Sequence, residues 1–317
     1  MKNWHPISLL NVDQKIGSSV IGSRIKPLLE IIISPSQKGF LKGCYIGKCT
    51  RLIYDLIERA EEENIPGILL LIDFEKAFDT VEWSFMEKTL KFFGFGNELC
   101  RWIQTFYTDL NSCILNNGHC SNFFPINRGV RQGDPLSTYL FILVMEILTA
   151  TLKNDNTIAG ININNSEYLT SLYANDTSII LKDDTDSLEK CLDIFDQFGS
   201  CAGLKANLDK TQAVWIGSGF GCGVEYLPHR NLLWNHSGKF KVLGIEFDLS
   251  ASDKVLCNFH TKIEKIKSIL NTWVHRELTY YGKITVIKSL SLPILTQCFS
   301  VLPNPPKEIF TELLNLF

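Results

Sequence analysis

The hydrophobic and polar positions of the chain follow two periods, one typical of amphipathic helices and one typical of strands. Residues 68–72 form an unbroken apolar run of strand length, which ends in Asp73. Two further apolar runs, 168–174 and 177–181, are separated by the polar pair 175–176. Such a pair between two strands predicts a β-hairpin with polar residues at its tip.

Helical spacing of apolar residues recurs along the rest of the chain. It predicts helices over 16–33, 48–63, 80–93, 97–110, from about 135, and over 185–201, 254–275 and 280–292. Strand-like pieces are expected near 112–116, 122–127, 211–216 and 239–247. Helices and strands mixed in this order favour an α+β fold, and 317 residues exceed one comfortable core and indicate more than one subdomain.

Composition and charge narrow the class of protein. With 45% hydrophobic and 21% charged residues the chain is globular, and its net charge of −3 does not by itself favour a polyanion-binding protein. Charge distribution matters more, and residues 254–288 hold seven basic residues against two acidic ones. This segment is either a phosphate-binding face or a solvated helix surface.

Cysteine usage and the N-terminal residues bear on localisation. Ten scattered cysteines form no C-x-x-C pair, which is typical of reduced thiols. The chain shows no secretory leader, and its most apolar stretch, 136–148, is too short to span a bilayer. We therefore expect an intracellular protein, nuclear or cytoplasmic, with no membrane partner.

Two acidic residues carry the candidate chemistry. Asp73 ends a buried strand and Asp176 lies at a hairpin tip, so a sheet that joins these elements would bring two carboxylates to one rim. Like charges there need cations, and Mg²⁺ suits carboxylates that share a site with substrate phosphates. Two such ions can activate an attacking hydroxyl and stabilise a leaving pyrophosphate. Taken singly, each aspartate is better explained as a turn residue, and only the combination with the motifs below favours the metal site.

A series of short blocks resembles the reverse transcriptases of LINE-like (non-LTR) retrotransposons. In chain order the blocks are Pro6–Leu9, Gln37–Phe40, Leu71–Asp79, Arg128–Ser137, Tyr173–Asp176, Gly203–Thr211, Lys241–Ile245 and Leu278–Lys288. The resemblance covers nearly the whole chain in the family's order. It implies a right-hand polymerase fold, with a fingers region (1–65), a palm (66–250) whose antiparallel sheet is flanked by helices, and a partial helical thumb (251–317).

The resemblance also implies RNA-directed DNA synthesis, with an RNA template, a DNA primer and deoxynucleoside triphosphates as partners. Two Mg²⁺ ions would be held by Asp73 and Asp176. The remaining implied positions are the catalytic positions Asn175 and Lys210, the substrate-binding positions Phe74, Phe78, Arg131, Gln132 and Gly133, and the primer-grip positions Leu243 and Gly244. Phe78 would exclude a 2′-hydroxyl, Gln132 and Gly133 would line the nucleotide pocket, and Lys210 would lie near the leaving pyrophosphate.

The chain departs from the family at Asn175, where relatives carry the first hairpin aspartate. An amide oxygen can still bind a cation but brings no charge, so we expect weakened metal binding and impaired catalysis. The endonuclease of complete elements is expected outside this chain. Two further readings stay open: a non-catalytic nucleic-acid-binding remnant, and a pseudogene product without a role.

Overall fold

The computed structural model describes residues 7–251 and 256–316. Pro6 of the first block and Lys254 of the basic segment therefore lie outside the described residues. The chain divides into two compact units, each described here by itself. The first unit comprises 1–44, 68–213 and 225–233, and the second comprises 45–67, 214–224 and 234–317.

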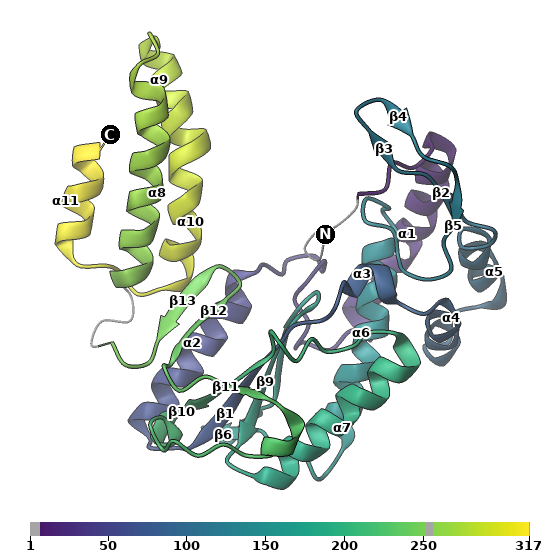
Figure 1. The fold of residues 1–317 in the computed structure, drawn as a ribbon, viewed down its shortest axis with the longest axis horizontal. Helices are drawn as coiled ribbons and strands as arrows, with labels where there is room; N and C mark the ends of the chain where they lie inside the picture. The colour runs from purple at the N-terminus through teal and green to yellow at the C-terminus, as the bar shows by residue number, and fades with distance from the viewer. Residues whose placement is uncertain (1–6, 252–255, 317) are drawn as a thin grey trace. The chain divides into compact units, whose positions relative to one another are not determined.

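Runs of helices and runs of strands follow one another along the chain, as expected for an α+β fold (Figure 1). The helices are α1 (Val12–Ile32), α2 (Gly47–Glu62), α3 (Ala77–Thr80), α4 (Trp83–Phe92), α5 (Asn97–Thr105), α6 (Ser137–Asn154), α7 (Thr185–Ala202), α8 (Leu256–Val274), α9 (Tyr280–Val286), α10 (Leu292–Val301) and α11 (Lys307–Leu316). Short 3₁₀ turns are η1 (Gly217–Gly219) and η2 (Pro228–Arg230), and η3 (Ile287–Ser291) is a π-helical turn.

The strands are short except around the central sheet. They are β1 (Gly67–Ile72), β2 (Asn111–Ser112), β3 (Leu115–Asn116), β4 (His119–Cys120), β5 (Phe124–Pro125), β6 (Ile161–Ile163), β7 (Ser166–Tyr168), β8 (Thr170–Tyr173), β9 (Asp176–Lys182), β10 (Gln212–Ile216), β11 (Leu233–Trp234), β12 (Lys239–Val242) and β13 (Ile245–Asp248). Most predicted elements are confirmed within a few residues. The predictions missed β4, the β6–β7 hairpin, β11 and helix α11.

The central sheet has the order β11-β10-β1-β9-β8. Five of the six β1 residues are buried, because protein covers both faces of this strand. β8 and β9 pair antiparallel from Thr170↔Ile179 to Tyr173↔Asp176, which confirms the predicted hairpin. β1 and β9 are neighbours, so the ends of these strands bring Asp73 and the hairpin tip to the same sheet.

Helix α6 is the buried helix that the sequence predicted. Leu140, Phe141 and Ile142 have no exposed surface, since α6 packs against α1, α4 and α7. The single acidic side chain inside it, Glu146, is only 6% exposed. Its Oε2 atom has no hydrogen-bond partner among the residues that the structure describes. Burial raises the pKa of Glu146, since removal from water disfavours the charged form.

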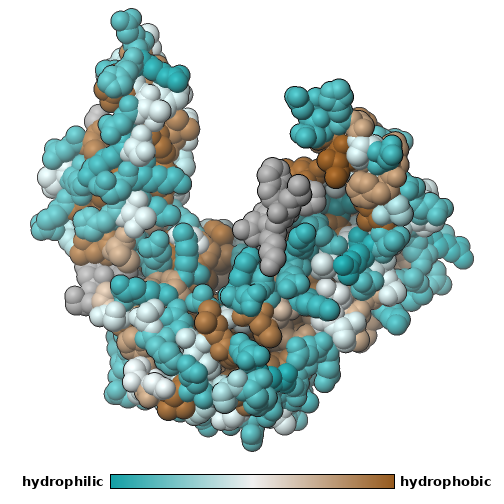
Figure 2. All heavy atoms as spheres, in the orientation of Figure 1, coloured by the Kyte–Doolittle hydropathy of each residue, from teal (hydrophilic) through white to brown (hydrophobic). Residues whose placement is uncertain are grey.

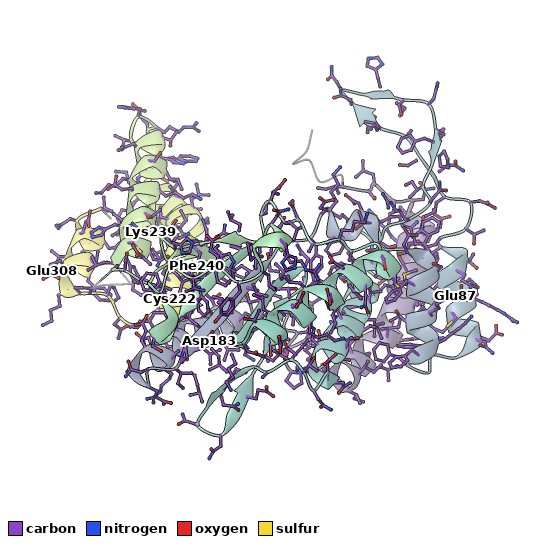
Figure 3. The ribbon with its side chains drawn as sticks, turned by 60° about the horizontal axis from the view of Figure 1, so that its bottom comes forward. Glu87, Asp183, Cys222, Lys239, Phe240 and Glu308 are labelled. Atoms are coloured by element: carbon purple, nitrogen blue, oxygen red, sulfur yellow. The ribbon has the colours of Figure 1, made fainter. Side chains whose placement is uncertain are left out.

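In the second unit, β12 and β13 form a tight antiparallel hairpin. The rings of Phe240 and Phe247 stack with centroids 5.1 Å apart, and Lys239 Nζ lies 3.3 Å from Asp248 Oδ2. Figure 3 labels Lys239 and Phe240 on this hairpin. The cross-strand pairs fix the register of the hairpin and thereby the residues at its turn.

The basic segment lies on α8 and on the helices after it. Lys267 is engaged by Glu264 and Glu312, each at 2.8 Å, so its charge is compensated within the unit. Lys265 and Lys283 are exposed and keep their charge at the surface. Figure 2 shows hydrophilic residues mixed with smaller hydrophobic areas on these C-terminal helices.

Residues 280–301 form one helical run, longer than the predicted 280–292. Pro293 does not end this helical run, because proline is tolerated in the first turn of α10. The π-helical turn η3 directly before α10 has a different hydrogen-bond pattern. By length and composition alone this run of 22 residues could cross a membrane, and 28% of its most apolar window is buried. It packs against α8 and also carries Lys283 and Lys288.

Candidate active site

Asp73 is held in place by its own backbone. Its N–H donates to Thr211 Oγ1 (3.4 Å) and its carbonyl accepts from the Asn207 N–H (2.7 Å). These contacts join the end of β1 to the segment between α7 and β10, which is the block 203–211 singled out in the sequence. The carboxylate itself remains accessible, with 41% of its side chain exposed.

The β8–β9 hairpin presents Asp176 beside this strand end. Its two-residue turn consists of Ala174 and Asn175, and Ala174 adopts a left-handed conformation with φ of 57°. Such a turn suits the right-handed twist of paired strands. Asp176 is exposed at the first position of β9, and Asn175 is partly exposed.

The two carboxylates influence each other electrostatically. The pKa of Asp176 is raised, first because nearby protein partly removes its carboxylate from water and second because Asp73 carries a like charge. Lys210 Nζ lies 3.7 Å from Asp73 Oδ2 and compensates part of that charge. The structure thus brings together Asp73, Asp176 and Lys210, three of the four catalytic positions expected from the sequence; Asn175 is next to Asp176 in the turn.

This donor set fits a hard divalent cation. Two neighbouring carboxylates would gain by sharing a cation, and Mg²⁺ binds through one or two carboxylates together with substrate oxygens. Across residues 7–251 and 256–316, no group of three or more His, Cys, Asp or Glu side chains converges to hold a metal. Asn175 lies next to Asp176 in the turn and contributes no carboxylate to such a group.

Phe78 is fixed by aromatic neighbours. Its ring stacks on Phe141 of α6 (centroids 4.4 Å apart, 12° between planes) and meets the edge of Phe40 at 6.3 Å. The Phe78 side chain remains partly exposed. Since Phe141 is fully buried, Phe78 rests on a rigid support five residues after Asp73.

The turn 129–133 places its residues in different environments. The Arg131 guanidinium is buried, pairs with Asp134 at 3.0 Å and lies 4.9 Å from the Tyr107 ring centre. These interior contacts leave only 7% of the Arg131 side chain exposed. The Gln132 carbonyl accepts from Ser8 N–H (2.9 Å), while Gly133, with φ of 101°, is exposed.

Phe74 also points into the protein. It is 4% exposed, and its ring packs 6.1 Å from Phe195 of α7. Only the main chain of Phe74 could therefore contact a substrate. That main chain forms a β-bridge with Ala206.

The expected primer-grip residues belong to the second unit. Leu243 and Gly244 form the turn between β12 and β13, with φ of 49° and 88°. Gln297 Nε2 donates to the Leu243 carbonyl (2.6 Å), and Lys262 Nζ lies 3.5 Å from the Gly244 carbonyl. Side chains of helices α8 and α10 thus hold the turn through its two carbonyls.

Gln37 lies beside the hairpin turn, although the sequence analysis gave it no role. Gln37 is 1% exposed and hydrogen-bonds to the backbone of Ala174 in the hairpin turn. The sequence signal was a polar Gln two residues before Gly39, but nothing local showed that its partner lies 137 residues away.

Comparison with known proteins places these features in a family. Residues 1–247 match the profile described as reverse transcriptase (RNA-dependent DNA polymerase). The "Transposon TX1 uncharacterized 149 kDa protein" of Xenopus laevis is 30% identical over 295 residues, covering 92% of this chain and 22% of that protein. The "Retrovirus-related Pol polyprotein from type-2 retrotransposable element R2DM" of Drosophila melanogaster is 28% identical over 272 residues, covering 81% and 24%.

Among solved structures, telomerase from Candida tropicalis in complex with a fragment of telomeric RNA has a TM-score of 0.52 at 13% identity. That match covers 95% of this chain and 46% of the telomerase chain. At this identity the likeness concerns the fold alone. The chain spans less than a quarter of the length of the two curated relatives named above.

Proposed function

Because the chain belongs to the reverse transcriptase (RNA-dependent DNA polymerase) family, we propose that it is the polymerase domain of a non-LTR retrotransposon protein. It would add deoxynucleotides to the 3′ end of a DNA primer and copy an RNA template. Its relatives from TX1 and R2 elements are proteins of this kind of retrotransposon. The α+β fold is that of right-hand polymerases, in line with the likeness to telomerase.

The observation that carries the proposal is the electrostatic coupling of Asp73 and Asp176 beside Lys210. Asp73 and Asp176 would hold the metal ions, and Mg²⁺ would supply charge stabilisation for the attacking and leaving oxygens when bound. Lys210 would lie on the side of the leaving pyrophosphate as a cation or proton donor. The exposed Gly133 and its neighbour Gln132 would line the nucleotide pocket, because glycine lets the backbone come close to a substrate.

Phe78 would select the sugar. Its ring is held by Phe141 and keeps an exposed part, so it would press on the position of a 2′-hydroxyl and exclude ribonucleotides. Arg131 and the ring of Phe74 would act from inside the protein, as supports of the pocket. Leu243 and Gly244 would contact the primer, and the exposed lysines of the basic segment would bind nucleic-acid phosphates.

Asn175 would impair this activity. It adds no negative charge beside Asp176, so the site would bind its two cations more weakly than a site with three carboxylates. The loss should exceed the roughly 10–100-fold that is typical of changes one shell further out. The same substitution favours the second candidate function, a non-catalytic nucleic-acid-binding remnant or pseudogene product.

Primer extension on an RNA template, with Mg²⁺ and deoxynucleoside triphosphates, tests both the proposed polymerase activity and its impairment by Asn175. The variant Asn175→Asp should extend the primer at least about 100-fold faster than the wild type. Asp73→Asn in the Asn175→Asp background is the matched control and should abolish extension. Equal rates for wild type and Asn175→Asp would refute impairment by Asn175. If both proteins bind primer–template in a salt-dependent manner but neither extends it, the remnant reading is supported.

The subdomain limits, partners and location follow from the same proposal. Fingers, palm and partial thumb would occupy 1–65, 66–250 and 251–317. The partners would be an RNA template, a DNA primer and deoxynucleoside triphosphates, and an endonuclease would be supplied by other parts of a longer element protein. An enzyme of this kind works inside the cell, in the nucleus or cytoplasm.

A further inference from the structure

The side-chain amide of Gln37 brackets the backbone of Ala174. Its Oε1 atom accepts from the Ala174 N–H (2.9 Å), and its Nε2 atom donates to the Ala174 carbonyl (3.2 Å). The same Oε1 also accepts from the Gly39 N–H (2.7 Å). One buried side chain thus satisfies both polar groups of a residue in the hairpin turn.

The backbone around Gln37 strengthens this contact. Lys38 N–H donates to the Leu172 carbonyl (2.9 Å), and Leu172 N–H donates to the Ser36 carbonyl (3.0 Å). These bonds form a parallel bridge along the free edge of β8. Segment 36–39 therefore extends the sheet by a short stretch, just before the turn that precedes Asp176.

Gly39 completes the contact by its lack of a side chain. A Cβ atom at this position would lie 2.3 Å from Ala174 N, which no neighbouring backbone tolerates. The close approach of the two backbones is what allows the Gln37 amide to reach both polar groups of Ala174. Gln37 and Gly39 act together on one point of the hairpin.

Ala174 is the residue whose position matters most for the hairpin tip. It has a left-handed φ of 57°, a conformation that is strained for a non-glycine residue and is kept only when its surroundings fix it. Asn175 and Asp176 follow directly, so a rotation at Ala174 would displace both side chains relative to Asp73. The chemistry of glutamine suits this task, because its amide offers a donor and an acceptor side by side.

We propose that Gln37 is a positioning residue, which sets the place of Asn175 and Asp176 relative to Asp73 and thereby the affinity of the site for divalent cations. This inference rests on the proposed function. Methionine would fill the same volume but leave both polar groups of Ala174 without their partner. Supporting residues around metal ligands typically change metal affinity by about 10–100-fold when they are replaced.

The test measures Mn²⁺ binding by the full chain, from the loss of the free Mn²⁺ signal in electron paramagnetic resonance. Asp176→Asn identifies the part of the binding that belongs to the site. Gln37→Met should raise the dissociation constant of that part by about 10–100-fold. Gly39→Ala, which keeps the Gln37 amide but pushes on Ala174 N, should change it in the same direction. Amide hydrogen exchange of residues 172–177 should become faster in both variants.

Ser187→Ala is the matched control for a loss of stability alone. Ser187 is fully buried, and its hydroxyl donates to the Thr157 carbonyl (3.0 Å) and accepts from the Ala159 N–H (3.1 Å), away from the hairpin tip. It should lower the unfolding temperature comparably without changing the Mn²⁺ dissociation constant or the exchange of 172–177. Equal Mn²⁺ affinity in wild type and Gln37→Met would overturn the inference. Mn²⁺ binding that is insensitive to Asp176→Asn in the wild type would count against the proposed function as well.

Discussion

Lys210 Nζ lies 3.7 Å from Asp73 Oδ2, although Asp73 directly follows β1 and Lys210 comes much later in the chain, between α7 and β10. Two hydrogen bonds create this proximity: the Asn207 N–H donates to the Asp73 carbonyl, and the Asp73 N–H donates to Thr211 Oγ1. Because 58% of the Lys210 side chain is exposed, the ion pair contributes little to stability. We propose that the role of Lys210 lies in the chemistry at the site.

Replacement of Lys210 by alanine should slow nucleotide addition by about 100-fold, the lower range for a positioned proton donor. Lys210→Arg keeps the positive charge but cannot readily give up a proton. Single-turnover primer extension in the Asn175→Asp background measures both rates. If Lys210→Arg is as active as the parent, Lys210 acts through charge alone; if Lys210→Ala is also as active, the residue has no role in the reaction.

Phe78→Ala should relax selection against ribonucleotides. Removing a ring held between Phe141 and Phe40 opens the space for a 2′-hydroxyl, and discrimination should fall by about 100-fold. The measurement is the ratio of incorporation efficiencies for a deoxynucleotide and its ribonucleotide. Phe85→Ala removes a comparable aromatic contact with Phe198 and should leave the ratio unchanged. An unchanged ratio in Phe78→Ala would contradict the assigned role.

Gly203→Ala should destabilise the protein by more than about 2 kcal/mol, since a left-handed residue with a side chain costs roughly 1–2 kcal/mol before any clash. Gly203 ends α7 with φ of 80°, and an added Cβ would lie 2.1 Å from the Thr80 carbonyl oxygen. Gly43→Ala is the control, because its φ is 71° but no atom lies within 4 Å of its Cβ. Urea unfolding should show the larger loss for Gly203→Ala; similar losses would mean that the clash is relieved.

Glu146→Gln should stabilise the protein more at neutral pH than in mild acid. Burial raises the folded-state pKa of Glu146, so between the unfolded and folded pKa values the folded protein binds more protons. The free energy of unfolding therefore falls as pH rises through that window and stays lower above it.

A glutamine cannot ionise and escapes this loss. Urea unfolding at about pH 7 and about pH 4 measures the difference between Glu146→Gln and wild type at each pH. Glu98, an exposed member of a surface ion pair, provides the control. Glu98→Gln should change stability little at either pH. If Glu146→Gln stabilises the protein more at pH 4 than at pH 7, burial does not disfavour the charged form of Glu146.

Hydrophobic periodicity was enough to locate most of the helices and four strands of the central sheet, β1, β8, β9 and β10. The β8–β9 hairpin followed from two apolar runs around a polar pair. The β6–β7 hairpin was overlooked, although Asn164 and Asn165, both with positive φ, are a turn signal between alternating residues. Local rules thus sufficed where a contact lies within one element or one turn.

Side-chain direction could not be read in the same way. The family blocks marked Arg131 and Phe74 as substrate contacts, but Asp134 and Phe195 draw their side chains inward. A motif specifies residue types at positions on the chain, whereas burial depends on neighbours that come from other segments. The role of Gln37 is hidden for the same reason, because Ala174 is remote in sequence.

The bond between Gln37 and Ala174 joins residues 137 positions apart, and this separation has a consequence for biosynthesis. Gln37 is synthesised well before Ala174. Its amide is therefore hydrated or forms transient contacts while the intervening chain is made. Closing so long a loop carries an entropic cost that only the assembled sheet can offset. The hairpin tip should therefore acquire its final geometry among the last events of folding, after the helices around it have already docked.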